Sequence, residues 1–493
     1  MRTIIFLFTA VSILLCTEGF GRTRYVAPNG SDGALGLAAT PWLTLQHAAD
    51  SVRAGDTVIV RAGTYKGFVL GWDNPQNGTP SLPILFRAEP GAIINDRNAK
   101  TADGINLEGA SYIVIDGFTV KNTLGAITRA GMRAVADTGA VLRNNVIDSC
   151  GTWGILTGFS ERAVIENNMT SRSVGQHGIY FSNTASHPVI RGNTVFGNSA
   201  NGIHMNGDVS QGGAGIISYA LVENNIIYNN GKAGGSGINC DGVQHSRFQN
   251  NLLYNNHASG ISLYQIDASL PATNDTVVNN TIVEASDARW CVNIKNGSIG
   301  AVVMNNILYN YNPSHGSISL DAESVAGFTS DYNIVMDRLT RDDDNTILSL
   351  LQWRTATAQD LHSKIATPLQ LFVDSATANY RLTATSPARD AGTAQNAPVK
   401  DIAGTSRPQN SVFDIGAYEY TNSSVVLHPD AQRQQLSQTA TRSFDLLGRS
   451  IPGTRVTASG FIILEAGSKH ATEVLYGARA GAVSKDGQQE VRP

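Results

Sequence analysis

The amino-acid sequence predicts an all-β solenoid, in which short parallel strands coil in stacked turns around a shared core. Three observations predict this class. A doublet containing Asn recurs at a nearly constant interval, a short run of alternating apolar and polar residues precedes each doublet, and no helical periodicity separates one repeat from the next. Strands that repeat every ~20–30 residues are typical of parallel β-solenoids, whose turns share one core with their neighbours.

The N-terminus has the pattern of a secretory signal peptide. Residues 1–21 read MRTIIFLFTAVSILLCTEGFG, with one Arg before an apolar run and small residues near Gly21. A short apolar segment with these flanks is cleaved on export, so we expect a secreted protein whose mature chain begins near residue 22. No later segment is apolar enough to predict a transmembrane helix.

The doublets define the turns of the solenoid. Their second members are separated by steps of 23 to 32 residues. An Asn at a turn can bond the backbone of neighbouring turns and tolerates a left-handed conformation, so we expect the stacked Asn side chains to form a structural ladder. The doublets are Asn144-Asn145, Asn167-Asn168, Gly192-Asn193, Asn224-Asn225, Asn250-Asn251, Asn279-Asn280, Asn305-Asn306 and Tyr332-Asn333.

With these repeats, the chain resembles the right-handed parallel β-helix proteins, an architecture that pectate-lyase-like enzymes share. The stretch TLQHAADSV, followed by AGDTVIVRAGTY, is similar to the amphipathic helix and first strand of such proteins. The resemblance covers about residues 24–420. It implies that residues 22–420 form a right-handed parallel β-helix whose open N-terminal end is capped by the helix. It implies less about activity, because this fold hosts lyases, hydrolases, epimerases and non-enzymes.

The end of the predicted β-helix is similar to the tail of many bacterial secreted β-helix proteins, and we expect it to close the fold. The matching residues are Ser386-Pro387, Asp390, Gly392, Asp401, Gly404, Arg407-Pro408, Asp414-Ile415-Gly416-Ala417 and Glu419.

Two further segments follow this tail. Residues 421–442 lack apolar periodicity and read as a linker. Residues 443–493 contain DLLGR and SGFIIL and resemble the C-terminal sorting domains of the type IX secretion system, although the chain continues past that pattern. The resemblance implies a small β-sandwich-like module, a secretion machinery as partner, and a bacterial extracellular protein that is secreted or attached to the cell surface. Whether the module is cleaved or anchors the protein is left open.

Aligning the turns at their Gly-Ile start separates core positions from outward positions, because neighbouring residues of a strand point to opposite faces. The third residue after each start gives a core column, which places Cys240 inside and excludes it as a catalytic thiol. This column is Leu107, Ala134, Thr157, Phe181, Met205, Cys240, Leu263 and Ile294. With Cys16 lost in the signal peptide, we expect Cys150, Cys240 and Cys291 to be buried thiols rather than a disulfide framework.

The outward columns predict one polar face, because stacked turns are only ~4.8 Å apart. The insertions 208–220 and 266–275 flank this face and are expected to form the walls of a binding groove. The residues expected on the face are Tyr180, His204, Asn206, Asn239, Asp241, Tyr264, Asn293 and Lys295, with His177, Asp208, His257 and Trp290 at its turns.

The face suggests an acidic polysaccharide as ligand and a lyase as the first function. β-Elimination requires a base that removes the proton next to a uronate carboxylate and a positive group that stabilises the resulting charge. The family resemblance implies a Lys or Arg base and Ca²⁺. We therefore predict Lys295, His204 and Tyr264 as catalytic residues and Asp241, Asp208 and Asn239 as ligands of Ca²⁺, whose preferred ligands are oxygen atoms. The predicted substrate-binding residues are Tyr180, His177, Asn206, Asn293, His257 and Trp290. His204 and Tyr264 could also act as base and acid without a metal.

Other functions stay open from the sequence. A glycoside hydrolase needs paired carboxylates, for which Asp208 and Asp241 are candidates and Asp267 is a third. An epimerase on the same scaffold and a non-catalytic glycan-binding or cell-surface protein are further alternatives. The formal net charge of -4 and the pI of about 6.2 argue against a nucleic-acid partner, which needs a basic face. We expect a monomer.

Overall fold

The computed structural model describes residues 21–73, 76–422, 455–456, 461–464 and 472–475. The chain divides into two compact units, residues 1–422 and 423–493. The predicted signal peptide, apart from Gly21, lies outside the described residues. So do the predicted linker from residue 423 onward and most of the predicted sorting module.

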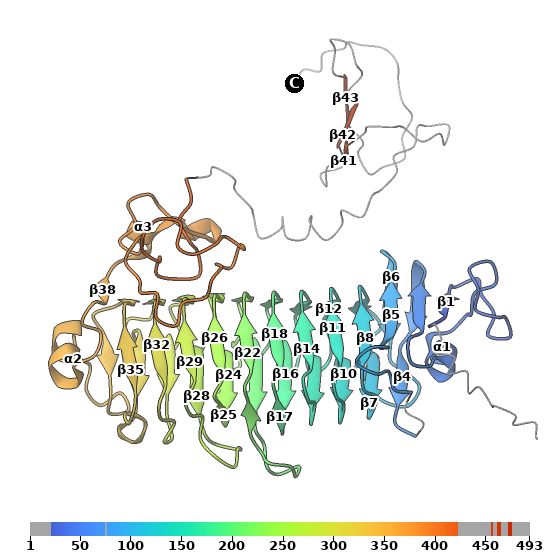
Figure 1. Cartoon of the computed structure of the whole chain (residues 1–493), viewed down its shortest axis with the longest axis horizontal. Helices are drawn as coiled ribbons and strands as arrows, with labels where there is room; N and C mark the ends of the chain where they lie inside the picture. Colours follow the sequence, from blue (N-terminus) through green and yellow to red (C-terminus); the bar gives the residue numbers. More distant parts are fainter. Residues whose placement is uncertain (1–20, 74–75, 423–454, 457–460, 465–471, 476–493) are drawn as a thin grey trace, which may run out of the picture. The chain divides into compact units, whose positions relative to one another are not determined.

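The first unit is a right-handed parallel β-helix, as predicted (Figure 1). Each complete turn contributes one strand to each of three long sheets, which we call the first, second and third sheets in the order in which the chain enters them. The first sheet contains β1 (Thr23–Val26), β2 (Thr57–Val60), β5 (Ile84–Ala88), β8 (Ile113–Asp116), β11 (Val141–Arg143), β14 (Val164–Glu166), β18 (Val189–Arg191), β22 (Leu221–Glu223), β26 (Arg247–Gln249), β29 (Thr276–Val278), β32 (Val302–Met304) and β35 (Thr329–Asp331).

The second sheet faces away from the candidate site. It contains β3 (Gly63–Lys66), β6 (Ala92–Asp96), β9 (Thr119–Lys121), β12 (Val146–Asp148), β15 (Met169–Ser171), β19 (Thr194–Phe196), β23 (Ile226–Tyr228), β27 (Leu252–Tyr254), β30 (Thr281–Glu284), β33 (Ile307–Asn310), β36 (Ile334–Val335) and β38 (Lys364–Ile365).

The third sheet carries the predicted polar face. It contains β4 (Phe68–Gly71), β7 (Ile105–Glu108), β10 (Ala130–Val135), β13 (Trp153–Gly158), β16 (Ile179–Ser182), β20 (Ile203–Asn206), β24 (Ser236–Asp241), β28 (Ser259–Tyr264), β31 (Val292–Ile294), β34 (Ile318–Leu320) and β37 (Leu339–Thr340). A short fourth sheet follows it in three turns and contains β17 (Ala185–Ser186), β21 (Ile217–Ser218) and β25 (Val243–Gln244).

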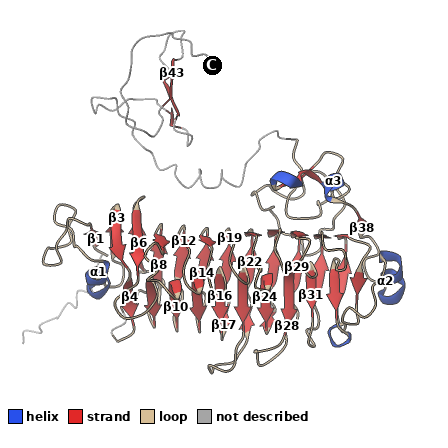
Figure 2. Ribbon diagram, turned by 180° about the vertical axis from the view of Figure 1, so that it is seen from behind, coloured by secondary structure: helices blue, strands red, loops and turns tan. Residues whose placement is uncertain are grey.

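Helices cover both ends of the β-helix (Figures 1 and 2). At the N-terminal end, α1 (Leu45–Ser51) begins where the Thr44 side chain accepts the backbone N–H of His47, and it confirms the predicted cap. At the other end, α2 (Leu350–Thr357) inserts Trp353, whose indole N–H donates to Asp360 at 2.9 Å. No pattern in the sequence predicted α2. The short 3-10 helices η1 (Ala322–Ser324) and η2 (Ser375–Thr377) lie in loops.

The Asn doublets divide two tasks between their members. The first member of each doublet has a φ between 52° and 65°, so the turn is left-handed at that position. The second member is buried and bonds to the next turn. Asn225, for example, accepts the backbone N–H and the amide Nδ2 of Asn193 and donates to the Oδ1 of Asn251. The predicted ladder is confirmed from Asn145 to Asn333.

The predicted core column is also confirmed. Strand register pairs Phe181 with Met205, Met205 with Cys240 and Cys240 with Leu263, and all four side chains are buried. Cys150 and Cys291 are likewise buried free thiols.

A second apolar core lies on the outer side of the second sheet. The segment 366–420 folds back along the β-helix rather than covering its end, and it includes α3 (Pro368–Leu371) and the antiparallel strands β39 (Phe372–Asp374) and β40 (Asn379–Leu382). Its apolar residues pack on outward residues of β23, β27, β30, β33 and β36. This explains why those strands carry apolar residues on both faces.

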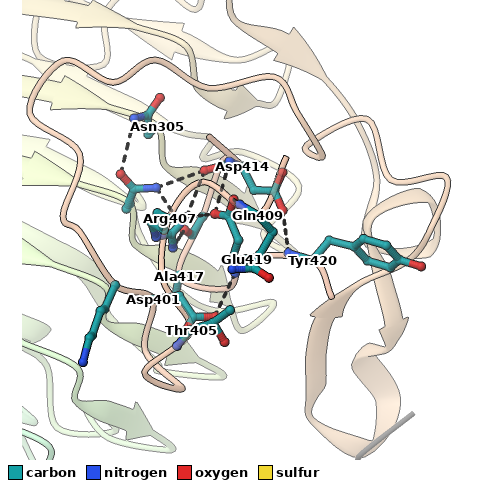
Figure 3. Close-up of polar contacts among 12 residues, drawn as sticks. Asn305, Asp401, Thr405, Arg407, Gln409, Asp414, Ala417, Glu419 and Tyr420 are labelled. Carbon is teal, nitrogen blue, oxygen red and sulfur yellow. Dashed lines mark hydrogen bonds and ion pairs between the residues drawn. The ribbon is translucent and has the colours of Figure 1, made fainter. Parts of the chain in front are cut away.

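A buried ion pair holds this closing tail together (Figure 3). Arg407 donates to the Glu419 carboxylate at 2.8 Å and to the Gly416 carbonyl at 2.7 Å, and both charged side chains are almost fully buried. Arg407 also reaches the Asn250 side chain of the β-helix at 3.3 Å. The tail motif is therefore a structural clamp along the second sheet, and it does not close the end of the β-helix.

In the second unit the described residues form three antiparallel strands, β41 (Arg455–Val456), β42 (Phe461–Leu464) and β43 (Thr472–Leu475). In the described part of the chain, no helix has the length and apolar character needed to span a membrane.

Candidate functional site

Strand register brings the predicted face residues into two outward columns of the third sheet. The first column is Tyr180, His204, Asn239, Ser262 and Asn293. The second column is Ser182, Asn206, Asp241 and Tyr264, and Lys295 comes directly after β31. The columns agree with the predicted alignment, but their side chains are buried or half-buried rather than fully exposed.

The two predicted insertions cover this face and pair with each other. Asp208 and Ala268 form an antiparallel bridge, and the Val209 N–H donates to the Asp267 carbonyl at 3.2 Å. The Ser269 N–H donates to Gly215 at 3.0 Å. Two long loops are visible beyond the other turns near β17, β25 and β28 (Figure 1). The loop after β20 and the loop after β28 are therefore joined to each other by backbone hydrogen bonds.

Two histidines of neighbouring turns are hydrogen-bonded in this face. The Nε2 of His177 lies 3.1 Å from the Nδ1 of His204. The backbone N–H of Asn201 donates to the Nδ1 of His177 at 3.3 Å, and the Asn201 Nδ2 lies 3.2 Å from the same nitrogen. The orientation of this Asn amide is fixed, because its Oδ1 accepts the backbone N–H of Ser236.

These contacts determine which nitrogens carry protons. The Nδ1 of His177 accepts, so the proton of this neutral ring lies on Nε2 and is donated to His204. His204 then carries its proton on Nε2, a buried atom without a hydrogen-bond partner among the described residues. Burial lowers the pKa of His177 to about 4 and lowers the pKa of His204 well below its ordinary value. At neutral pH, His204 is therefore a neutral hydrogen-bond donor on this face.

Two phenols lie on the same face. The oxygen of Tyr180 accepts from the Nδ2 of Asn206 at 3.2 Å, and the oxygen of Tyr264 accepts from the Nδ2 of Asn239 at 2.8 Å. Burial raises the pKa of both tyrosines, and the Asp241 carboxylate raises that of Tyr264 further. Both phenols are thus protonated, and each O–H is available as a donor.

The face also carries an aromatic strip. The ring of Tyr180 stacks on His204 with centroids 5.1 Å apart and on Trp153 with centroids 5.7 Å apart. Trp153 was missed in the sequence analysis because it precedes the Gly that starts its turn. Rings arranged in this way suit contact with the apolar faces of sugar rings.

The three predicted Ca²⁺ ligands have other partners. The Asp241 carboxylate accepts the backbone N–H groups of Ile266, Asp267 and Ala268 at 2.9, 2.7 and 3.3 Å, so it anchors the 266–275 loop. Burial raises the Asp241 pKa although these amides oppose the shift.

The remaining two predicted ligands are also engaged. Asp208 accepts the Ser210 N–H at 2.7 Å, and the Oδ1 of Asn239 accepts the Ser236 hydroxyl at 3.1 Å. The described residues contain no group of three or more His, Cys, Asp or Glu side chains that could hold a metal ion. The contacts of Asp241, Asp208 and Asn239 therefore do not fit a preformed Ca²⁺ site.

Lys295 is a paired cation. Its Nζ donates to the Ser319 hydroxyl at 2.7 Å and to Asp343 at 2.8 Å, and it lies 3.6 Å from Asp344. Lys295 therefore acts as the anchor of the acidic loop that contains Asp343 and Asp344.

The remaining predicted residues lie near the edges of the face. Trp290 is 2% exposed, and its indole donates to Asp344 at 3.0 Å, so the ring is held in the interior. His257 pairs with Asp287 at 2.9 Å in the turn before β28. Asn293 is half-buried between its neighbours in the first column.

Comparisons with known proteins agree with this architecture. A family model described as "Right handed beta helix region" matches residues 91–211. The chain is 34% identical over 111 residues, 21% of its length, to the uncharacterized protein YwoF of Bacillus subtilis (strain 168). It is 39% identical over 67 residues, 14% of its length, to pectate lyase PEL9 of Emericella nidulans. These matches span 23% and 16% of the relatives' lengths.

A crystal structure of pectate lyase Pel9A is similar over most of the fold. The alignment covers 82% of this chain and 97% of that chain, with a TM-score of 0.56 and 16% sequence identity. Identity at this level shows the fold alone. These findings establish the chain as a protein with the right-handed parallel β-helix fold.

Proposed function

We propose that this protein is an extracellular polysaccharide lyase that cleaves a uronate-containing glycan by β-elimination on the outward face of the third sheet. The observation that carries the proposal is the unpartnered Nε2–H of His204, a neutral donor that lies beside a protonated phenol. The segment similar to a pectate lyase and the Pel9A-like fold support the same reaction class.

The donors of the face fit the charge that develops in this reaction. Removal of the proton next to a carboxylate moves negative charge onto the carboxylate oxygens, and fixed donors in a site with little water stabilise that charge strongly. In the proposed mechanism, His204 and Tyr180 donate to the uronate carboxylate. A neutral imidazole or phenol in this role requires no metal ion.

The base and acid come from the loop and from β28. Asp267 is exposed on the loop that covers the face, and its carboxylate lies 3.4 Å from the Asn206 amide. A carboxylate base combined with neutral hydrogen-bond donors can remove a proton next to a carbonyl group. The proton next to the carboxylate passes to Asp267, and the electron pair of that C–H bond forms a carbon–carbon double bond. The bond to the glycosidic oxygen breaks, and its electron pair leaves with the oxygen. Tyr264 gives its proton to the departing oxygen.

A glycoside hydrolase is the second candidate, and one observation favours it. Asp208 and Asp267 lie on paired loops over the same face, so two carboxylates could flank a glycosidic bond. A hydrolase would create reducing ends without an unsaturated product.

The product of cleavage tests the proposal. The full-length protein is incubated with polygalacturonate, alginate and chondroitin sulfate, each with Ca²⁺ and with a chelator. Ultraviolet absorbance reports unsaturated ends, and a reducing-end assay runs in parallel. We expect absorbance and reducing ends to rise together on an acidic glycan. Reducing ends without absorbance would replace the lyase by the hydrolase, and no change in either signal on any substrate would contradict both.

A further inference from the structure

A pocket lined by several polar residues lies on the turns that connect the second sheet to the third. It has a volume of about 400 Å³. Its lining includes Gly197, Ser199, Asn229, Lys232, Asn255 and His257. Of these residues, only His257 belonged to the predicted binding set.

The pocket forms where one position in a column of stacked turn residues is glycine. Arg172, Gly197, Asn229 and Asn255 each follow a strand of the second sheet directly, and all four have a left-handed φ between 52° and 65°. Asn255 donates to the Asn229 side chain of the neighbouring turn. At Gly197 the column has no side chain, which leaves a recess beside two Asn amides.

A glycine-rich loop brings a lysine to the edge of this recess. Residues 231–235 read GKAGG, and the three glycines have φ values of 89°, 102° and 106°. The Ala233 N–H donates to the Ser199 carbonyl at 2.8 Å, which ties the loop to the preceding turn. Lys232 at the tip is exposed and has no ion pair within the described residues.

Other charged groups lie on the same turns as Lys232. Arg289 lies on the other side of the loop and donates to the Gly235 carbonyl at 2.8 Å. The nearby Asp287 pairs with His257 at 2.9 Å. The pocket therefore offers an ammonium group together with amide donors and acceptors. This combination suits a ligand with a carboxylate and several hydroxyl groups.

The pocket is close to the proposed catalytic face. Its turns run directly into β20, β24 and β28, and the five residue steps from Ser199 to His204 span at most ~17 Å. The face carries Asp208, Asp241 and Asp267, and Lys295 beside it is paired with carboxylates. Lys232 thus lies beside the catalytic face rather than on it.

We propose that this pocket is an accessory subsite, in which Lys232 binds the carboxylate of an acidic sugar residue in the same glycan chain that the face cleaves. The substrate class rests on the proposed function. Binding at the pocket does not depend on cleavage, because the pocket holds the glycan at a sugar residue away from the reacting bond.

Calorimetric titration tests the subsite independently of turnover. Uncut oligomers of galacturonate, mannuronate and hyaluronan are titrated at 4 °C into the full-length protein and into Lys232→Gln. Lys121→Gln, on β9 of the second sheet and outside the pocket, is the matched control. We expect Lys232→Gln to weaken binding of one acidic oligomer about threefold to tenfold, as for loss of one charge-assisted contact. Lys121→Gln should bind as the unmodified protein does, and the methyl-esterified oligomer should bind alike to all three.

Three outcomes would overturn the subsite. These are an unchanged affinity of Lys232→Gln, the same loss in Lys121→Gln, or no binding of any carboxylated oligomer. Binding of a sulfated oligosaccharide alone would also overturn the carboxylate assignment. If Lys232→Gln weakens binding while no unsaturated product forms, the subsite stands and the lyase proposal fails.

Discussion

His177 and His204 illustrate how one side chain sets the chemistry of another. The Asn201 N–H fixes the proton of His177 on Nε2, and His177 in turn fixes the proton of His204 on Nε2. Neither residue could be assigned a proton position from the sequence. His204 was predicted on the outward face, which the register confirms, but its partner depends on the geometry of a turn 27 residues away.

The tautomers can be measured directly. We predict that ¹⁵N spectra of imidazole-labelled protein at pH 7 show both His177 and His204 as neutral rings protonated on Nε2. In His177→Ala, the Nδ1 of His204 loses its donor, so we expect His204 to populate both tautomers. A cationic or Nδ1-protonated His204 in the unmodified protein would contradict the proposed donor role.

The same histidines make stability depend on pH. Their folded pKa values lie below the unfolded value of ~6.5. The unfolded state therefore binds more protons than the folded state. As a result, the free energy of unfolding decreases as pH falls from ~6.5 toward 4. We predict that urea unfolding midpoints fall over this range and that the fall is smaller in the double variant His177→Gln, His204→Gln. An equal fall in both proteins would assign the effect to other groups.

At the scale of elements, the third-sheet columns could be predicted because a strand has a period of two. Once the Gly-Ile starts were aligned, every core and outward residue followed. What could not be predicted is what covers the outward residues. The carboxylates that pair with Lys295 are 48 and 49 positions away in the chain, and the amides that bind Asp241 lie in an insertion without a repeat. Long-range contacts of this kind leave no local pattern.

The Asn ladder should be a major source of stability. Asn225→Ala removes the side-chain hydrogen bonds to Asn193, Ile190 and Asn251, so the buried Asn193 N–H and Ile190 carbonyl lose a partner. We predict a loss of about 2–4 kcal/mol in the free energy of unfolding, measured by urea titration. Asn224→Gly is the matched control, because Gly accepts the left-handed φ of 56° at the adjacent position and should change stability little. Equal losses in both variants would argue against the ladder.

The loop over the face depends on Asp241. Asp241→Ala removes the acceptor of three backbone amides of residues 266–268. We expect faster amide hydrogen exchange throughout this loop and a loss of cleavage, with the core strands of the β-helix unchanged. If Asp241 instead acts as a Ca²⁺ ligand, the variant should lose Ca²⁺ binding while loop exchange stays as in the unmodified protein.

At the scale of the whole molecule, the β-helix could be predicted from the sequence because each turn repeats the same pattern of strands and Asn doublets. The second core, in which outward residues of the second sheet pack against the tail, was not predicted from the sequence. The apolar pairs after each doublet, such as Ile226-Ile227 and Leu252-Leu253, contained the signal, since a strand that is apolar on both faces is covered on both. The cap helix α2 buries only Leu350 and Trp353, too few to form a recognisable helical pattern.

The tail should depend on its buried ion pair. Arg407→Ala leaves Glu419 as an uncompensated buried charge. We predict that the variant loses about 3–5 kcal/mol of tail stability, so that limited proteolysis cleaves residues 380–420 while the β-helix remains folded. Arg389→Ala, in the same tail but with a partly exposed side chain, is the control. Resistance to proteolysis in Arg407→Ala would contradict the clamp.

In the proposed function, the outward face of the third sheet is a lyase site in which His204 stabilises the reacting carboxylate. The most direct measurement is the rate of unsaturated product formation by His204→Ala, compared with His245→Ala, which removes an exposed imidazole from a turn after β25. We predict a rate about 100-fold to 1,000-fold lower for His204→Ala and an unchanged rate for His245→Ala. Equal rates of product formation by the unmodified protein and by correctly folded His204→Ala would contradict it.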